Sequence, residues 1–208
     1  MVRTFSNVFN STTEPYEKVF GGSLHESFSE TFNLQLNGDI SQNEVVEAIS
    51  HLKQNKAGGP DTLIPEIFIH SAEIITPFLV GFFNQVFSSG QFPDACTEAV
   101  IRPIHKKGNT QYPHNYRGIS LLNVCSKLCS YILNQRLVIW IEENGSSGEE
   151  QAGFRRDYST TDHIYTLFAV IQIYLLHKKK LYVAFINFKK AFDLISYAKL
   201  WPILLNMV

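Results

Sequence analysis

The stretch from Leu181 to Ser196 constrains the fold more than any other, because a strongly apolar run in it ends abruptly at a polar residue. Residues 181–186 read Leu-Tyr-Val-Ala-Phe-Ile, and this β-branched and aromatic composition predicts a buried strand of about six residues. Asn187 follows, and the residues from Ala191 onward fit the opening of a helix. A polar side chain at the mouth of a buried strand is held rigidly beside an open loop, which makes Asn187 a candidate site residue. A metal ion at this point would favour a carboxylate, whereas the chain offers a neutral amide.

The composition is that of a globular protein: 208 residues, 45% of them hydrophobic, suffice for one large domain or two small subdomains with a sizeable core. The N-terminus lacks the basic-then-apolar order of a signal peptide, and the most apolar long window, residues 74–87, is too short and too polar to span a bilayer. The three cysteines are odd in number and irregularly spaced, which favours a reducing compartment. Cys125 and Cys129 lie four apart inside a helical pattern, which predicts core thiols and leaves a zinc pair open. We therefore expect an intracellular protein, nuclear or cytoplasmic, with no membrane segment.

The net charge of −1 hides a strong asymmetry. Residues 1–101 contain four Lys/Arg and twelve Asp/Glu, whereas residues 102–190 contain thirteen Lys/Arg and six Asp/Glu. A basic half of this kind indicates a polyanionic partner such as a nucleic acid. Solvated surface lysines without a partner would produce the same count, so charge alone leaves both interpretations open.

Helix and strand signals alternate along the chain after a polar lead-in. Ser41 and Glu44 form a capping-box pattern ahead of an apolar helical repeat, and Ser159 with Asp162 can cap a later helix. Pro103 favours an edge position for the strand that contains it. We therefore predict helices over 42–54, 65–71, 77–88, 124–142 and 163–177, and strands over 99–105 and 115–122, besides the strand at 181–186.

Five segments of the chain, taken together, resemble the reverse transcriptase domain of non-LTR, LINE-type retrotransposons. Each is a weak match alone, but their order and spacing over residues 42–205 are specific to that family. They read Lys-Ala-Gly-Gly-Pro-Asp at 56–61, Pro-Ile-His-Lys-Lys-Gly at 103–108, Asn-Tyr-Arg-Gly-Ile-Ser-Leu-Leu at 115–122, Gln-Ala-Gly-Phe-Arg at 151–155 with Ser159 and Thr160, and Ala-Phe-Ile-Asn-Phe-Lys-Lys-Ala-Phe-Asp at 184–193.

The resemblance implies an α+β fold, helix-rich with a small sheet, that corresponds to the fingers and an incomplete palm of a right-hand polymerase. Residues 1–40 would be a poorly defined lead-in. Residues 41–208 would be a partial reverse transcriptase domain with the first palm strand, but without the second carboxylate motif or the thumb. The implied partners are an RNA template, a DNA primer and deoxynucleotides, and the oligomeric state stays open.

Catalysis in that family uses two magnesium ions, which activate the primer hydroxyl and neutralise charge on the transferring phosphate. The resemblance places the first metal-binding Asp where Asn187 stands, and the nearby Asp193 is not a metal ligand in the family. A neutral amide does not replace the missing charge. We therefore expect a truncated reverse transcriptase that is catalytically inactive, a pseudoenzyme with no intact metal set and no productively bound magnesium.

Nucleotide-binding residues are also implied by the resemblance. Arg155 would grip the triphosphate of the incoming nucleotide, because its planar fork pairs phosphate oxygens bidentately. Phe192 would be a steric gate against the ribose 2′-hydroxyl, and the backbone carbonyl of Phe188 would be a second metal contact. Apart from the resemblance, Arg155 would be interpreted as a surface or capping arginine and Phe192 as a core residue.

Nucleic-acid contacts are implied for three basic residues of the fingers, which would lie along template or nucleotide phosphates: Lys106, Lys107 and Arg117. An alternative function is therefore a non-catalytic nucleic-acid-binding remnant that uses the basic region 102–190. A third interpretation is an unstable gene relic, in which an incomplete palm sheet exposes an apolar edge.

Overall fold

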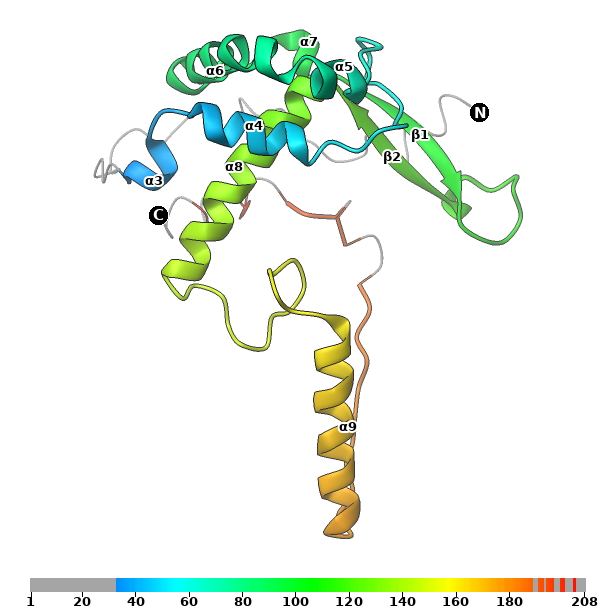
Figure 1. Ribbon diagram of the computed structural model, residues 1–208. Coiled ribbons are helices and arrows are strands. Elements are labelled where there is room, and N and C mark those ends of the chain that lie inside the picture. Colours follow the sequence, from blue (N-terminus) through cyan, green and yellow to red (C-terminus); the bar gives the residue numbers. More distant parts are fainter. Residues whose placement is uncertain (1–32, 189–190, 193, 197–198, 201–203, 205–208) are drawn as a thin grey trace. The chain divides into compact units, whose positions relative to one another are not determined.

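The computed structural model of the chain describes residues 33–188, 191–192, 194–196, 199–200 and 204. Most of the predicted lead-in, and Asp193, lie outside these residues. The chain divides into two compact units: the second consists of residues 137–195, and the first consists of the residues before and after that range. The described residues are helix-rich and contain one small two-stranded sheet, which confirms the α+β prediction (Figure 1).

The helices of the first unit follow the predicted order. They are α3 (Leu34–Asn37), α4 (Gln42–Ser50), α5 (Pro65–His70), α6 (Ala72–Ser89), α7 (Asp94–Thr97) and the first part of α8 (Val124–Glu143). The predicted capping box begins α4: the Ser41 N–H donates to Glu44 Oε2 at 2.8 Å, and the Glu44 N–H donates to Ser41 Oγ at 3.4 Å. The predictions over 42–54, 65–71 and 124–142 are thus confirmed, with ends shifted by a few residues.

Helix α6 differs from its prediction, because it begins at Ala72 rather than at Pro77. The prediction placed the proline in the first turn, where its missing N–H removes no backbone hydrogen bond. In the structure Ala72 and Ile75, both ahead of the proline, pack against the buried core, and this burial offsets the lost bond. The predicted end is confirmed: Gly90 adopts φ 66°, and its N–H donates to the Val86 carbonyl oxygen at 2.9 Å.

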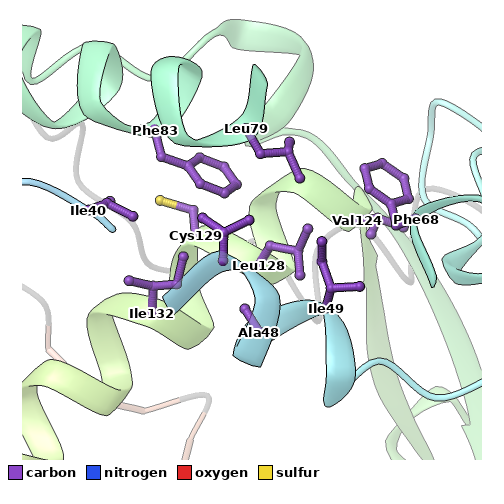
Figure 2. Close-up of a cluster of buried hydrophobic side chains, with 11 residues drawn as sticks. Ile40, Ala48, Ile49, Phe68, Leu79, Phe83, Val124, Leu128, Cys129 and Ile132 are labelled. Carbon is purple, nitrogen blue, oxygen red and sulfur yellow. The ribbon is translucent and has the colours of Figure 1, made fainter. Parts of the chain in front are cut away.

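The core of the first unit lies between α4, α6 and α8 (Figure 2). Its buried side chains from these helices are Val45, Ala48, Ile49, Leu79, Phe83, Val124, Leu128, Cys129 and Ile132. Ile40 is anchored in the same cluster, because the Asn84 side chain accepts from its N–H at 2.7 Å and donates to its carbonyl oxygen at 2.9 Å. Cys129 is buried and the half-buried Cys125 packs against the same cluster, which confirms the prediction of core thiols, and burial raises the pKa of the Cys125 thiol to about 11.

The sheet is an antiparallel hairpin of β1 (Ala99–His105) and β2 (Tyr116–Leu122). Both predicted strands are confirmed, the second beginning one residue later than predicted. Each strand has one pairing partner among the described residues, so Pro103 occupies an edge strand as predicted.

The second unit holds the end of α8 and helix α9 (Thr160–Leu176). The predicted cap is present, because the Ser159 N–H donates to Asp162 Oδ2 at 2.9 Å and the Asp162 N–H donates to Ser159 Oγ at 3.3 Å. Across both units, none of the described helices combines the length and the apolar character needed to cross a membrane.

The strand predicted over 181–186 is not formed, and residues 181–188 adopt neither strand nor helix. Their apolar side chains are exposed, including Tyr182 at 86%, Phe185 at 85% and Ile186 at 81%. A strand needs a neighbour for its backbone N–H and C=O groups, and the two strands among the described residues pair with each other. The strand prediction for 181–186 was therefore wrong, because it rested on apolar composition alone and assumed a neighbouring strand.

Candidate functional site

Hairpin β1–β2 gathers basic and apolar side chains on one face. Arg102 lies opposite Ile119, and Ile104 lies opposite Arg117. Because opposite residues and alternate residues of a strand share a face, these four side chains form one surface, which we call the basic hairpin face. Ile104 is 51% exposed and Ile119 41% exposed, and within the described residues neither arginine has an ion-pair partner. Guanidinium groups beside exposed apolar groups suit a phosphate together with the base or sugar next to it.

The tip of the hairpin presents two further cations, Lys106 and Lys107, on a loop of fixed shape. The Lys106 N–H donates to the Asn115 carbonyl oxygen at 2.8 Å, and the Asn115 side chain donates to the Asn109 carbonyl oxygen at 2.8 Å. Gly108 has φ 85° and lies so close to Asn115 that a Cβ would come within 2.8 Å of Nδ2. The structure therefore brings both lysines together with the basic hairpin face on one hairpin.

Arg155 is engaged by hydrogen bonds inside the second unit. Its Nε and Nη2 donate to the two carboxylate oxygens of Glu142 at 2.9 and 2.8 Å, and its Nη1 donates to the Gly148 carbonyl oxygen at 3.0 Å. The guanidinium also lies over the Tyr158 ring, 4.2 Å from its centroid. The side-chain hydrogen bond between Arg155 and Glu142 raises the pKa of Arg155 and lowers the pKa of Glu142. The fork predicted to grip a triphosphate is thus held by a carboxylate of the same unit.

The predicted gate residue, Phe192, lies against the same segment. Its ring meets the Phe154 ring edge-to-face, with the centroids 6.1 Å apart and the planes at 90°. Phe154 directly precedes Arg155, has φ 64° and is 90% exposed. A left-handed backbone at a bulky residue marks a constrained turn, and this turn brings Arg155 and Phe192, two of the predicted nucleotide-binding residues, into one region.

The other two predicted site residues of this unit are Asn187 and Phe188. No described contact joins either of them to Arg155 or Phe192. Asn187 is exposed and makes no hydrogen bond among the described residues, and Phe188 is 76% exposed. Magnesium prefers charged oxygen ligands, so the neutral amide of Asn187 is a weaker ligand for this ion than an aspartate at the same position. In the described part of the chain, no three His, Cys, Asp or Glu side chains gather closely enough to hold a metal ion.

A buried amide that the sequence analysis did not single out, Asn123, joins three segments of the first unit. It is 3% exposed, its Nδ2 donates to the Ala95 carbonyl oxygen at 2.6 Å, and its Oδ1 accepts from the Asp61 N–H at 3.5 Å. Gly59 lies so close that a Cβ would come within 2.5 Å of the Asn123 backbone nitrogen. The signal in the sequence was an amide between a strand-like run and the start of a helix, a position that favours capping residues.

Comparison with known proteins gives a consistent set of relatives, although no protein-family model matches the chain. The chain is similar to the probable RNA-directed DNA polymerase from transposon BS of Drosophila melanogaster, at 28% identity over 190 residues, which are 91% of this chain and 20% of that protein. It is 30% identical over 153 residues to the probable RNA-directed DNA polymerase from transposon X-element of the same species, covering 72% of this chain and 17% of that protein. It is 28% identical over 155 residues to the RNA-directed DNA polymerase from mobile element jockey, also of Drosophila melanogaster, covering 74% and 17%. The chain thus spans a fifth or less of the length of these relatives.

Proposed function

Because this chain belongs to the family of RNA-directed DNA polymerases of non-LTR retrotransposons, we propose that residues 41–208 form the fingers and the first part of the palm of such a polymerase. In this proposal the chain binds an RNA template, a DNA primer and deoxynucleotides, but does not catalyse nucleotide transfer. The observation that supports the loss of catalysis is Asn187, which stands where the family resemblance places a metal-binding carboxylate.

The chemistry explains why this one side chain matters. Nucleotide transfer develops negative charge on the reacting phosphate, and metal ions held by anionic ligands neutralise that charge. Asparagine offers a carbonyl oxygen but no charge, so it holds a hard divalent cation less well than aspartate. Removing one group that stabilises transition-state charge lowers rates by about 100- to 1,000-fold in well-studied enzymes.

A primer-extension assay tests the loss of catalysis. With a primed RNA template, Mg²⁺ and deoxynucleotides, the natural chain should extend the primer no more than an Asn187→Ala variant does, because neither protein supplies the charge. Asn187→Asp restores a carboxylate of the same size, so comparing its primer extension with that of the natural chain tests whether position 187 needs a charge. Primer extension by the natural chain would refute this part of the proposal, and its disappearance in Asn187→Ala would show in addition that the amide supports catalysis.

A second proposed function, a non-catalytic nucleic-acid-binding module, is favoured by the basic hairpin face. Its two arginines have no carboxylate partner among the described residues, whereas Arg136 and Arg155 each form an ion pair. Unpaired and exposed cations on a fixed loop and a hairpin are available to phosphates without breaking an existing contact. Such a module would act inside the cell, in the nucleus or the cytoplasm.

Removing the hairpin charges should weaken binding to single-stranded RNA. We expect a triple glutamine variant of Lys106, Lys107 and Arg117 to lower the affinity about tenfold near 0.1 M salt and to reduce the salt slope by about 2, since each phosphate contact contributes roughly 0.7. Fluorescence anisotropy at several salt concentrations measures both quantities. The matched control replaces the three lysines at 178–180, which removes equal charge elsewhere. Equal losses in the two variants would show that the hairpin is not the binding surface.

Freeing Arg155 from Glu142 should strengthen nucleotide binding. In the proposed function Arg155 grips a triphosphate, and the Glu142 carboxylate occupies the same N–H donors. We expect Glu142→Gln to tighten the binding of dATP about threefold, because an exposed ion pair is a weak competitor, and Arg155→Gln to weaken it. Isothermal titration calorimetry measures both. Unchanged affinity in both variants would remove Arg155 from the nucleotide site.

A further inference from the structure

A pocket of about 270 Å³ in the first unit is lined by three lysines. Lys53 and Lys56 come from the segment that follows α4, and Lys127 comes from the start of α8. The rings of His51 and Tyr131 form part of the wall. The remaining lining is apolar and consists of Ala48, Leu52, Pro65 and Leu128. We call this cavity the lysine pocket.

The charge of the lysine pocket is opposite to that of the sequence around it. Residues 1–101 contain four Lys/Arg against twelve Asp/Glu. The two of these cations that fall among the described residues, Lys53 and Lys56, both line the pocket, and no carboxylate lines it. Neither they nor Lys127 form an ion pair with another described residue. Two cations of an otherwise acidic part of the chain thus line one cavity together with Lys127, and none of the three has an ion-pair partner among the described residues.

The wall of the pocket is held in shape by contacts on two sides. The rings of His51 and Tyr131 stack with their centroids 4.8 Å apart, and the Tyr131 hydroxyl lies 3.0 Å from His51 Nδ1. The same nitrogen lies 2.9 Å from the Glu47 backbone carbonyl oxygen of α4, so the ring is held from both sides. On the other side, a Cβ on Gly58 would come within 2.6 Å of the Leu63 carbonyl oxygen, so the chain folds back tightly just after Lys56. A preformed wall loses little conformational entropy when a ligand binds.

We propose that the lysine pocket binds a phosphate group, supplied either by the backbone of a polynucleotide or by the polyphosphate of a nucleotide. Lysine ammonium groups bind phosphate as point charges, and the apolar floor strengthens their attraction by lowering the local dielectric. The cavity is smaller than the roughly 300–1,000 Å³ of pockets for drug-sized molecules, and this size suits a single small group. The choice of phosphate as the anion rests on the proposed function, whereas the positive charge of the pocket does not.

Binding of the full chain to two probes, single-stranded oligouridylate and metal-free tripolyphosphate, tests the proposal. A triple glutamine variant of Lys53, Lys56 and Lys127 should lower the affinity for at least one probe about tenfold, and for the RNA it should reduce the salt slope by about 2. The control variant at 178–180 removes equal charge outside the pocket and should lose clearly less affinity than the pocket variant. Arginine at the same three pocket positions keeps the charge and should retain most of the binding. Thermal melting by circular dichroism checks that each variant is folded.

The outcomes distinguish a polynucleotide phosphate from a nucleotide phosphate. They also distinguish failure of the pocket proposal from failure of the proposed nucleic-acid-binding function. A loss confined to the RNA assigns the pocket to a polynucleotide backbone, and a loss that includes tripolyphosphate assigns it to a nucleotide. Pocket-dependent tripolyphosphate binding in a chain that binds no RNA would support the pocket and contradict the nucleic-acid-binding function. RNA binding that falls in the hairpin variant but is unchanged in the pocket variant, with tripolyphosphate binding also unchanged, would overturn the pocket and leave the proposed function standing.

Discussion

Arg136→Met should lower the free energy of unfolding by about 3 kcal/mol, as expected when one partner of a buried ion pair is removed. The Arg136 side chain is 8% exposed, and its Nε and Nη2 donate to the Glu44 carboxylate at 2.6 and 3.0 Å. The remaining donors of the guanidinium bind three backbone carbonyl oxygens ahead of α4, those of Leu36, Gly38 and Asp39. Methionine fills the space of the aliphatic stem but returns none of these bonds, so three carbonyl oxygens lose the guanidinium donors and the Glu44 carboxylate keeps only those of Ser41 among the described residues.

Urea denaturation monitored by circular dichroism measures this loss. The matched control is Arg155→Met, because Arg155 makes the same bidentate pair with Glu142 on side chains that are slightly more exposed, 12% and 37% against 8% and 29%, so water replaces the lost partner more readily. Glu44→Gln in the Arg136→Met background should recover part of the stability, since it removes the carboxylate that was left unpaired. A loss in Arg136→Met no larger than that in Arg155→Met would contradict the expectation.

The same ion pair makes the effect depend on pH. Burial alone would raise the pKa of Glu44, but hydrogen bonds from Arg136 and Ser41 outweigh burial and lower the pKa below its ordinary value. Because the folded-state pKa is lowered, this stabilisation is present above the unfolded-state pKa of about 4.3 and is lost as the pH falls through the folded-state value. The stability difference between the natural chain and Arg136→Met should therefore shrink below about pH 4.

Signals that act within a few residues predicted most of the regular structure. The reciprocal bonds of Ser41 with Glu44 and of Ser159 with Asp162 are made within three residues, so the start of α4 and α9 is visible in the sequence. The hairpin was also predictable, because its two strands are neighbours in the sequence and only ten residues connect them. Its formation brings Lys106, Lys107 and Arg117 onto one hairpin.

Contacts between distant residues were not predictable from local patterns. Arg136 bonds to residues 92 to 100 positions earlier, and Asn123 bonds to a carbonyl oxygen 28 positions earlier. Arg155 was predicted as a triphosphate ligand or, apart from the resemblance, as a surface or capping arginine, and its pairing with Glu142 depends on how the turn after α8 folds back. The strand predicted over 181–186 is not formed for a related reason, since a strand is defined by its partner as much as by its own composition.

The residues of the proposed nucleic-acid binding and the residue of the proposed loss of catalysis belong to different units of the chain. The basic hairpin face and the lysine pocket both lie in the first unit, and the pocket shares Ala48 and Leu128 with the core of that unit. Asn187 lies in the second unit and makes no hydrogen bond with the described residues. A change of charge at Asn187 therefore alters neither the first unit's core nor its cations, so loss of catalysis at this position is compatible with continued binding of nucleic acid.

Gly59→Ala should lower the free energy of unfolding by about 3 kcal/mol, the upper part of the range for forcing extra atoms into a packed site. The added Cβ would lie 2.5 Å from both the backbone nitrogen and Oδ1 of Asn123, and 2.6 Å from the carbonyl carbon of Leu122. Two of these three atoms belong to the backbone, which moves less easily than the end of a flexible side chain. Asn123 would have to shift, and its buried hydrogen bond to the Ala95 carbonyl oxygen would be strained.

Gly81→Ala is the matched control, because Gly81 lies within α6 and a Cβ there would meet nothing within 4 Å. The control should stabilise the chain by about 0.5–1 kcal/mol, since alanine favours a helix more than glycine does. Thermal melting of both variants measures this difference in stability. Because Gly59 holds the loop that also carries Lys56, any folded fraction of Gly59→Ala should bind phosphate less tightly than Gly81→Ala. Equal melting temperatures in the two variants would mean that this loop does not need the close approach of Gly59 to Asn123, and would contradict the expectation.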